Sequence, residues 1–149
     1  MSTEQNKTIV RRWIKDMFEK GNLALADELF TSDSISHDRS GPGPNGEWPR
    51  GPEGARAVVK AYRGAFPDIK YTIEDQIAEG DLVVTRWRAS GTNTGPLMGL
   101  PATGKPAAIS GIETERLVNG KIAESWVNFD NISMLVQLGL APAPGQGKL

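Results

Sequence analysis

The sequence predicts an α+β domain in which helices pack on one face of a curved antiparallel sheet. Two observations predict this fold class: apolar residues recur at helical spacing through much of the first half, and they alternate with polar residues through the second half. Helices followed by antiparallel strands form a layered domain, because each element must bury its apolar side against another. The chain has 149 residues, which is enough for one core.

Three helices are expected in the first half. The apolar stripe over residues 9–18 has the i, i+3, i+4, i+7 spacing of an amphipathic helix, and Gly21 supplies its end. Residues 22–30 form a second, short helix, because the asparagine at its start is a good N-cap. Residues 52–66 form the third, which begins with a proline in its first turn and ends before Pro67.

A hairpin is expected around residues 79–81, where Glu-Gly-Asp separates two alternating segments. A three-residue turn would place Ile73 opposite Trp87 and Glu74 opposite Arg86. A two-residue turn would oppose Glu74 and Trp87 instead. Because opposed side chains share a face of the sheet, the three-residue turn is the predicted register.

A second hairpin joins residues 106–118 to residues 121–129. The Asn-Gly pair at positions 119–120 is typical of a two-residue hairpin turn.

One more helix is expected over residues 132–138. The domain is therefore assigned to residues 1–140. Residues 141–149, which are rich in proline and glycine, are assigned to a flexible tail.

The second hairpin is expected to bring polar side chains to one face of the sheet. Strand alternation places Trp126, Asn128 and Asp130 on the same side. With a two-residue turn, Trp126 lies opposite Glu113 and Asp130 lies opposite Ile109. Polar groups that converge in an apolar surrounding are typical of a small-molecule pocket.

The composition excludes several functions. Lys and Arg number 17 against 18 Asp and Glu, and the net charge of -1 without a basic block argues against nucleic-acid binding. The chain has no cysteine and a single histidine, His37, which excludes a metal site built from cysteines or from two histidines. No apolar run approaches the roughly 20 residues that span a bilayer, and the N-terminus is polar, so a soluble cytoplasmic protein without membrane contact is expected.

Two long loops interrupt the regular elements, over residues 40–51 and 92–105. The second loop carries Leu97, Met98 and Leu100, and apolar residues in a loop need a surface to cover. Loops of this length often form lids or binding loops, and simple packing onto the core is an equal alternative.

Six short motifs follow one another along the chain. They are Phe66-Pro67-Asp68, Ala78-Glu79-Gly80-Asp81, Gly91-Thr92-Asn93-Thr94-Gly95, Pro101-Ala102-Thr103-Gly104-Lys105, Gly120-Lys121-Ile122-Ala123-Glu124-Ser125-Trp126 and Gln137-Leu138-Gly139. Together they resemble the SnoaL-like polyketide cyclase (ester cyclase) family of the nuclear-transport-factor-2-like superfamily, over almost the whole chain.

The resemblance implies a cone-shaped barrel, in which a strongly bent antiparallel sheet wraps around the N-terminal helices and leaves an internal apolar pocket. It implies no metal and no organic cofactor, since characterised members close an aromatic polyketide ring by intramolecular aldol condensation. In the family, a carboxylate at the end of the strand with the E-x-W motif is the acid/base, and this role falls on Asp130. The family often carries histidine after Gly-Thr, where this chain has Asn93, and a neutral amide cannot carry a proton.

The predicted site has catalytic and substrate-binding positions. The catalytic candidates are Asp130 and His37. The substrate-binding candidates are Trp126, Asn128, Glu113, Asn93, Met98, Phe66 and Trp87. A carboxylate surrounded by apolar side chains has a raised pKa and becomes a useful base near neutrality.

Several candidates also have a structural interpretation. Asp130 precedes the last predicted helix, where Asp is a preferred N-cap. His37 is either a residue of the pocket rim or a hydrogen-bonded structural histidine. Glu113 is either a second acid of the site or a solvent-facing residue near a strand end. Trp87 and Trp126 are interpreted as wall or core residues rather than reacting groups.

These observations predict a cofactor-free enzyme of the polyketide cyclase type, which performs acid/base chemistry on an apolar, oxygenated or polyketide-like small molecule. A non-catalytic protein that binds a similar ligand is the alternative. Epoxide hydrolysis is the weakest alternative, because the strand around Arg86 offers no Asp beside its arginines. A sheet face left without helices usually pairs in this superfamily, so a homodimer or homotetramer is expected.

Overall fold

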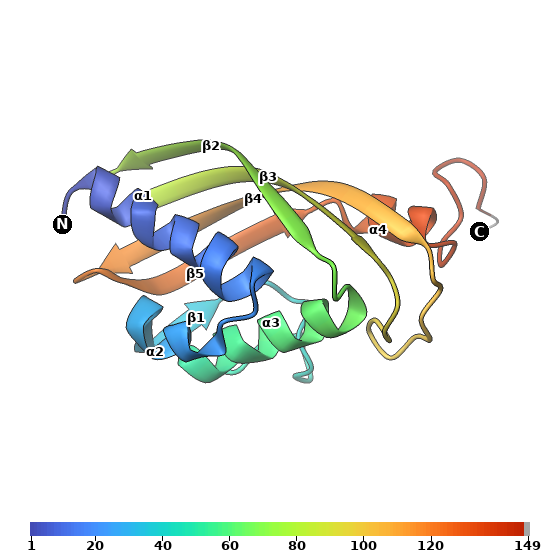
Figure 1. Cartoon of the computed structure of the whole chain (residues 1–149), viewed down its shortest axis with the longest axis horizontal. Helices are drawn as coiled ribbons and strands as arrows, with labels where there is room; N and C mark the ends of the chain where they lie inside the picture. Colours follow the sequence, from blue (N-terminus) through green and yellow to red (C-terminus); the bar gives the residue numbers. More distant parts are fainter. Residues whose placement is uncertain (148–149) are drawn as a thin grey trace.

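In the computed structural model, which describes residues 1–147, a curved five-stranded sheet bends over the N-terminal helices (Figure 1). The sheet order is β1-β5-β4-β3-β2, with β1 parallel to β5 and the other neighbouring strands antiparallel. The predicted α+β class is confirmed. The elements are α1 (Thr3–Arg12), the π-helix η1 (Trp13–Glu19), the 3-10 helix η2 (Leu23–Leu25), α2 (Ala26–Leu29), β1 (Phe30–Ser36), α3 (Pro52–Ala65), β2 (Lys70–Glu79), β3 (Leu82–Thr92), β4 (Pro106–Val118), β5 (Lys121–Phe129) and α4 (Asn131–Gln137).

The sheet bends strongly but does not close. Strands β1 and β2 are its outermost strands and do not pair with each other. Helix α1 and the π-helix η1 pack against β2, helix α3 packs against β1, and α4 lies against β4. The expected cone-shaped barrel is therefore an open, curved sheet with its helices on the inner side (Figure 1).

The first predicted helix exists but contains two kinds of turn. Its α-helical part, α1, is capped by Ser2 and Gln5, which exchange hydrogen bonds between side chain and backbone. The chain then continues as the π-helix η1, a form that is often found at functional sites. Both Trp13 and Phe18 of this segment are buried, with ring centroids 5.4 Å apart. The wider turn thus contributes two aromatic rings to the interior.

The other helix predictions differ in outcome. Residues 22–30 contain only the 3-10 turn η2 and the single α turn α2, and the Asn22 side chain makes no capping bond. Helix α3 begins at Pro52, as predicted, and ends at Ala65, one residue before the predicted end. Helix α4 matches the helix expected over residues 132–138 to within one residue at each end.

Strand β1 has no counterpart among the predicted elements. Its second to fifth residues are Thr-Ser-Asp-Ser, so the segment lacks the apolar alternation that indicates a strand. The strand pairs with β5, with Phe30 beside Ile122 and Ile35 beside Glu124. The neighbouring strand therefore determines this conformation, and the local sequence does not.

A bulge at Glu74 changes the predicted register of β2 and β3. Ile73 lies opposite Trp87, as expected, but the next pair is Asp75 with Arg86. The predicted pairing of Glu74 with Arg86 is wrong, because Arg86 Nε lies 2.7 Å from Asp75 Oδ2. The extra residue in β2 leaves a two-residue turn where three residues were expected.

A second bulge, at Ala123, changes the register of β4 and β5. The two-residue Asn-Gly turn is confirmed, but beyond the bulge Trp126 lies opposite Thr114 rather than Glu113. Opposed residues share a face, so Trp126 points to the outer side of the sheet while Glu113 points toward the helices. The predicted pairing of Trp126 with Glu113 is wrong.

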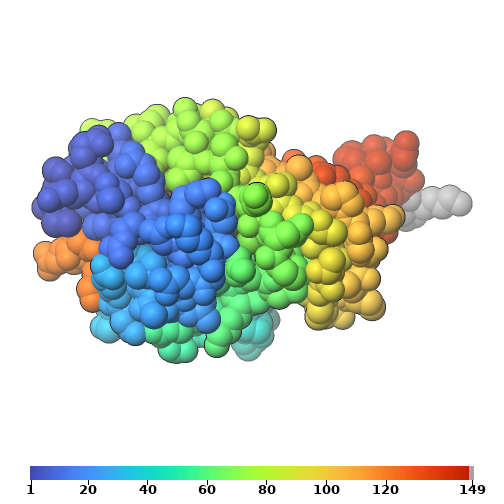
Figure 2. Space-filling view, viewed as in Figure 1, coloured from blue at the N-terminus to red at the C-terminus, as the bar shows by residue number. Residues whose placement is uncertain are grey.

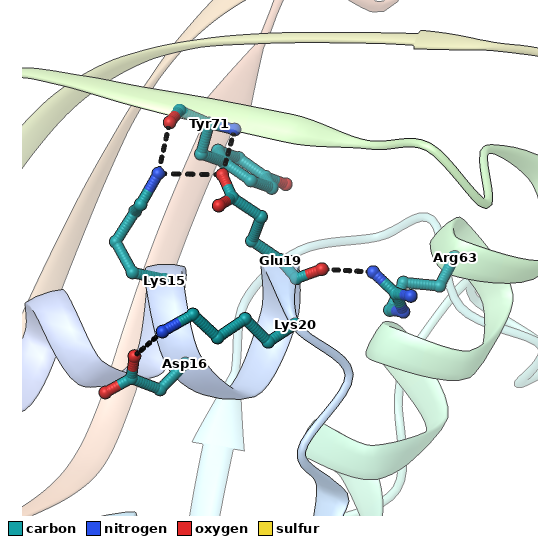
Figure 3. A network of polar contacts seen from close by, with 6 residues as sticks. All are labelled: Lys15, Asp16, Glu19, Lys20, Arg63 and Tyr71. Carbon is teal, nitrogen blue, oxygen red and sulfur yellow. Dashed lines mark hydrogen bonds and ion pairs between the residues drawn. The ribbon is translucent and has the colours of Figure 1, made fainter.

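Polar contacts join η1 to β2 and α3 (Figure 3). Glu19 Oε2 accepts a hydrogen bond from the Tyr71 backbone N–H at 2.6 Å. Lys15 Nζ lies 2.8 Å from Glu19 Oε2 and 2.7 Å from the Tyr71 carbonyl oxygen, and Arg63 donates to the Glu19 carbonyl oxygen. Although partial burial opposes ionisation, the Lys15 ammonium and the Tyr71 N–H hold the pKa of Glu19 below its ordinary value. These contacts fix Tyr71 in the wall of the interior.

The C-terminal residues, red in Figure 2, project from the body of the molecule. The predicted tail covers residues 141–149, of which Lys148 and Leu149 lie outside the described residues. No helix within residues 1–147 has the length and apolar character needed to cross a membrane.

Candidate active site

A cavity lies between the inner face of the sheet and the helices η1 and α3. It contains about 1060 Å³ of atom-free space, a figure that includes the open solvent at its mouth. Much of its wall is aromatic. The rings belong to Trp13, Phe18, Phe30, Tyr62, Phe66, Tyr71, Trp87 and Phe129.

Two carboxyl groups lie in the same wall. Glu113 and Glu115 are two residues apart on β4 and therefore share its inner face. The exposed fraction is 6% for Glu113 and 0% for Glu115. Glu113 Oε2 accepts a hydrogen bond from Trp87 Nε1 at 3.0 Å. Glu113 Oε1 and both carboxyl oxygens of Glu115 are buried without a hydrogen-bond partner among the described residues.

Burial raises the pKa of both carboxyl groups. It raises the pKa of Glu113 to about 7, even though the hydrogen bond from Trp87 acts in the opposite direction. Burial and the neighbouring charge of Glu113 raise the pKa of Glu115 well above its ordinary value. Two adjacent carboxylates in an apolar site do not both ionise, so the pair retains at least one proton near neutral pH. One group can then accept a proton while the other donates a hydrogen bond.

Gly111 leaves room for the indole that binds Glu113. A Cβ atom at position 111 would lie 2.4 Å from Cζ2 of Trp87, which is closer than real contacts allow. The Trp87 ring also meets the Tyr71 ring edge to face, with centroids 5.1 Å apart. The Trp87 indole, which donates to Glu113, is therefore held between Gly111 and the Tyr71 ring.

A hydrogen-bonded chain connects the cavity to the loop over residues 37–51. The Tyr62 hydroxyl donates to Ser40 Oγ at 3.0 Å, and Ser40 Oγ donates to Asp38 Oδ2 at 2.7 Å. Trp48 Nε1 also donates to Asp38 Oδ2, at 3.2 Å. Burial raises the pKa of Tyr62 to about 12, so its hydroxyl keeps its proton. Tyr62 and Asp38 both line the cavity.

Three predicted site residues line this cavity: Phe66, Trp87 and Glu113. The solvent-facing interpretation of Glu113 is wrong, because the residue is buried. The interpretation of Trp87 as a wall residue is consistent with its position, and its indole N–H additionally binds an acid.

The structure places Asp130 at the N-terminus of α4. Its Oδ1 accepts a hydrogen bond from the Ser133 backbone N–H at 3.0 Å, and the residue is exposed. Asp130 is not among the residues that line the cavity. The predicted inward orientation is therefore wrong, because β5 ends at Phe129 and the next residue turns to cap the helix.

His37, Trp126 and Asn128 lie outside the cavity lining. His37 Nε2 lies 2.7 Å from Glu124 Oε2, and the His37 ring stacks on Trp126 with centroids 5.1 Å apart. Arg116 Nε donates to Glu124 Oε1 at 3.0 Å. His37 is therefore a hydrogen-bonded histidine outside the cavity, in agreement with its structural interpretation. Asn128 is exposed and lies opposite Ile112 on the outer face, because of the bulge in β5.

Asn93 and Met98 belong to the loop over residues 92–105. Asn93 is fully buried: its side-chain nitrogen donates to the Gly95 carbonyl oxygen at 2.8 Å, and its side-chain oxygen accepts from the Thr103 backbone N–H at 2.8 Å. It ties the loop together and does not line the cavity. Met98 is 51% exposed and lines a second depression, between the two loops and α3. Leu97 is buried, so this loop packs on the core in part.

Sequence reasoning missed Glu115, Tyr71 and the Asp38 chain. A signal for Glu115 was present, because strand alternation alone puts Glu115 on the same face as Glu113. Asp38 had no such signal, since it lies in an irregular loop that only the fold brings to the cavity. Within residues 1–147, no group of three His, Asp or Glu side chains is arranged to hold a metal ion.

The sequence matches the model of the SnoaL-like polyketide cyclase family over residues 8–138. The chain belongs to this family. The resemblance that the motifs indicated is thereby confirmed. No curated protein matches the chain.

Solved structures of the SnoaL-like and nuclear-transport-factor-2-like fold agree with this assignment. IdmH from Streptomyces antibioticus, described as a candidate polyketide cyclase, is 34% identical, with a TM-score of 0.76 over 91% of this chain and 99% of that chain. A candidate polyketide cyclase from Acidithiobacillus ferrooxidans is 28% identical, with a TM-score of 0.78 over 95% and 99% of the two chains. TsrD from Streptomyces laurentii, 24% identical, has the same fold, with a TM-score of 0.82 over 95% and 99%.

Proposed function

We propose that this protein is an enzyme of the polyketide cyclase type, in which Glu113 and Glu115 act as an acid/base pair on an apolar, oxygenated small molecule. The family and the similarity to IdmH support a cyclase-like role. The observation that carries the proposal is the pair of buried carboxyl groups in an aromatic cavity. Paired acids whose surroundings raise their pKa values are typical of acid/base sites.

In the proposed reaction, ionised Glu113 removes a proton from a substrate carbon between two carbonyl groups. The electron pair of the C–H bond becomes an enolate, whose oxygen accepts a hydrogen bond from protonated Glu115. The enolate carbon then attacks another carbonyl carbon of the same molecule and forms the C–C bond of the ring. The new alkoxide takes back the proton from Glu113, so the pair ends in its starting protonation state.

The remaining wall supports this chemistry in two ways. The apolar rings hold a flexible chain in a folded conformation, which brings the two reacting carbons together. The Trp87 indole N–H, which binds Glu113, keeps that carboxylate in one orientation. The reaction moves protons and forms one carbon–carbon bond, and it requires no redox cofactor.

Matched variants test the proposal on β-polyketone esters, with ring closure followed by absorbance and mass spectrometry. We expect turnover to fall about 100-fold or more in Glu113→Gln, as for the loss of a general base. Asp130→Asn keeps a good N-cap and is expected to retain wild-type turnover. The wild-type rate should rise with pH through about 7, because Glu113 must be ionised to act as a base. Loss of turnover in Asp130→Asn but not in Glu113→Gln would overturn the assignment.

Ligand binding without turnover is the second candidate function. It is favoured by Asn93, which stands where relatives often carry histidine and whose side chain is fully engaged within its loop. Tight binding of the polyketone esters, with no product from the wild-type protein, would support this alternative. Epoxide hydrolysis has less support, because no arginine of the described residues lines the cavity.

We further propose that two copies pair through the outer face of the sheet. No helix covers this face in the part of the chain that the structure describes, and it carries exposed apolar side chains on three neighbouring strands, among them Val84, Ile112 and Trp126. Exposed apolar patches of this kind mark interaction surfaces. Light scattering after size exclusion should give a dimer or tetramer for the wild type and a smaller species for Ile112→Lys. A monomeric wild type would overturn the proposal.

A further inference from the structure

The unpartnered carboxyl oxygens restrict the chemistry of the ligand that fills the cavity. Among the described residues, no protein N–H or O–H makes a hydrogen bond of good geometry to Glu113 Oε1 or to either oxygen of Glu115. Trp13 and Ser125 lie beside these groups, and the proton that the pair retains can bridge the two carboxyl groups. A proton shared by the pair leaves further acceptor lone pairs on the buried oxygens, and a buried polar atom without a partner costs about 1–3 kcal/mol. A ligand whose buried end donates hydrogen bonds would satisfy them.

A count of donors and acceptors shows what that buried end must supply. Two carboxyl groups that share one proton offer a single O–H donor, and all their other lone pairs are acceptors. A carbonyl or ether oxygen of a ligand can only accept that one hydrogen bond. A hydroxyl or an ammonium group can donate to the remaining oxygens. The enol form of a β-dicarbonyl compound also has such an O–H, so the requirement extends to the proposed substrates.

The charges around the cavity favour the same choice. Its described lining contains three acidic residues, Asp38, Glu113 and Glu115, and no Lys, Arg or His. A ligand carboxylate would therefore meet negative charge without a compensating cation, which is costly in a buried site. The rings of Trp13, Tyr71 and Trp87 line the same space, and aromatic faces attract cations.

We propose that the cavity binds apolar ligands through a hydrogen-bond-donating end group, a hydroxyl or an ammonium, which is directed at Glu113 and Glu115, and that it rejects the corresponding carboxylates. This inference rests on the site of the proposed function but not on its reaction. It predicts that the natural ligand is neutral or cationic at its buried end, so that a free acid would have to be esterified or reduced before it could bind.

Four probes with one ring system test the proposal: 2-naphthylmethanol, 2-naphthylmethylamine, 2-naphthylmethyl methyl ether and 2-naphthoic acid. Binding at pH 7 is measured by calorimetry and by quenching of the tryptophan fluorescence. We expect the alcohol, the amine or both to bind at least tenfold tighter than the ether and the acid. The alcohol and the amine distinguish donation by a neutral group from donation by a cation.

Variants test whether Glu113 and Glu115 cause the preference among the four probes. In Glu113→Gln we expect the preference for amine over acid to fall at least tenfold. The matched control is Glu124→Gln, which removes an acid that pairs with His37 and Arg116 outside the cavity lining, and it should keep the preference. If Glu113→Gln does not fold, the ranking of the four probes on the wild-type protein still decides the question.

The proposal is overturned if the acid binds as tightly as the alcohol and the amine, or if none of the probes binds at millimolar concentration. These outcomes are independent of turnover. A protein that discriminates among the probes but closes no polyketone ring would contradict the proposed function and leave this inference standing. A protein that closes a polyketone ring but binds the four probes equally would support the proposed function and contradict this inference.

Discussion

The buried carboxyl group of Glu113 should make the folded protein less stable as the pH rises. Burial raises its pKa to about 7 in the folded protein, from the ordinary 4.5 that applies to the unfolded chain. Below pH 4.5 both states bind the proton, and between pH 4.5 and 7 only the folded state retains it. The free energy of unfolding therefore falls through this window, by about 3 kcal/mol from this group, because each pH unit corresponds to about 1.4 kcal/mol.

Glu113→Gln is the perturbation that tests this effect. It also removes the charge that helps to raise the pKa of Glu115, so the stability gained at high pH is at least the part that comes from Glu113. Glutamine keeps an acceptor for the Trp87 indole N–H but cannot ionise, so the part of the pH dependence that comes from Glu113 should disappear. The variant should match the wild type near pH 4 and exceed its free energy of unfolding by at least about 3 kcal/mol near pH 8. Urea unfolding followed by circular dichroism at several pH values measures the difference.

The control for this experiment is Glu124→Gln, because Glu124 changes the free energy of unfolding with pH in the opposite direction. His37 and Arg116 hold the pKa of Glu124 below its ordinary value, so Glu124 contributes stability that is present above pH 4.5 and is lost as the pH falls. Glu124→Gln should therefore lower the free energy of unfolding at neutral pH and change little at low pH. If Glu113→Gln and the wild type show parallel pH profiles, the reasoning about the buried pair is refuted.

Three further substitutions test other contacts. Asp130→Ala removes the N-cap of α4 and should lower the free energy of unfolding by about 1 kcal/mol while ligand binding stays unchanged. Gly111→Ala introduces a Cβ against the Trp87 indole and should destabilise the protein by about 1–3 kcal/mol and shift its tryptophan emission. Glu19→Gln removes the charge that binds Lys15 and should cost about 1 kcal/mol, since the pair is only partly buried. Urea unfolding and fluorescence measure all three.

Each of these expectations has its own contrary result. Lost binding in Asp130→Ala would mean that the acid contributes to the cavity after all. An unchanged emission spectrum in Gly111→Ala would show that the indole has another place to go. Lys20→Ala is the control for Glu19→Gln, because it removes an exposed ion pair with Asp16 in the same segment and should leave the stability nearly unchanged. Equal effects of these two substitutions would contradict the assigned role of Glu19.

The fold could be predicted from the sequence because its signals are local. The helical stripe that begins at Ile9, the proline at the start of α3 and the Asn-Gly turn each specify their own element, and the structure contains all three. Strand β1 could not be predicted, because polar residues form most of it and its conformation depends on pairing with β5. Strands β1 and β5 are far apart in the sequence, so their pairing exists only in the folded protein and leaves no local signal.

The site was harder to predict because it depends on register. A single extra residue, at Ala123, decides that Trp126 and Asn128 point outward rather than inward. Asp130 was ambiguous for a different reason, since the same side chain suits a pocket and a helix N-terminus. Glu113 and Phe66 were among the predicted pocket residues and line the cavity. Glu113 does so on the face opposite to Trp126 and Asn128, so the register that grouped these residues was wrong.

The contacts of Lys15 and Glu19 with Tyr71 also occupy backbone groups at the edge of the sheet. Strand β2 is an edge strand, and its free backbone groups are a natural template for pairing with another chain. At Tyr71 both the N–H and the carbonyl oxygen already bind side chains of η1, so a foreign strand finds no open ladder position there. The π-helix thereby occupies one of the positions on this edge at which another strand could pair.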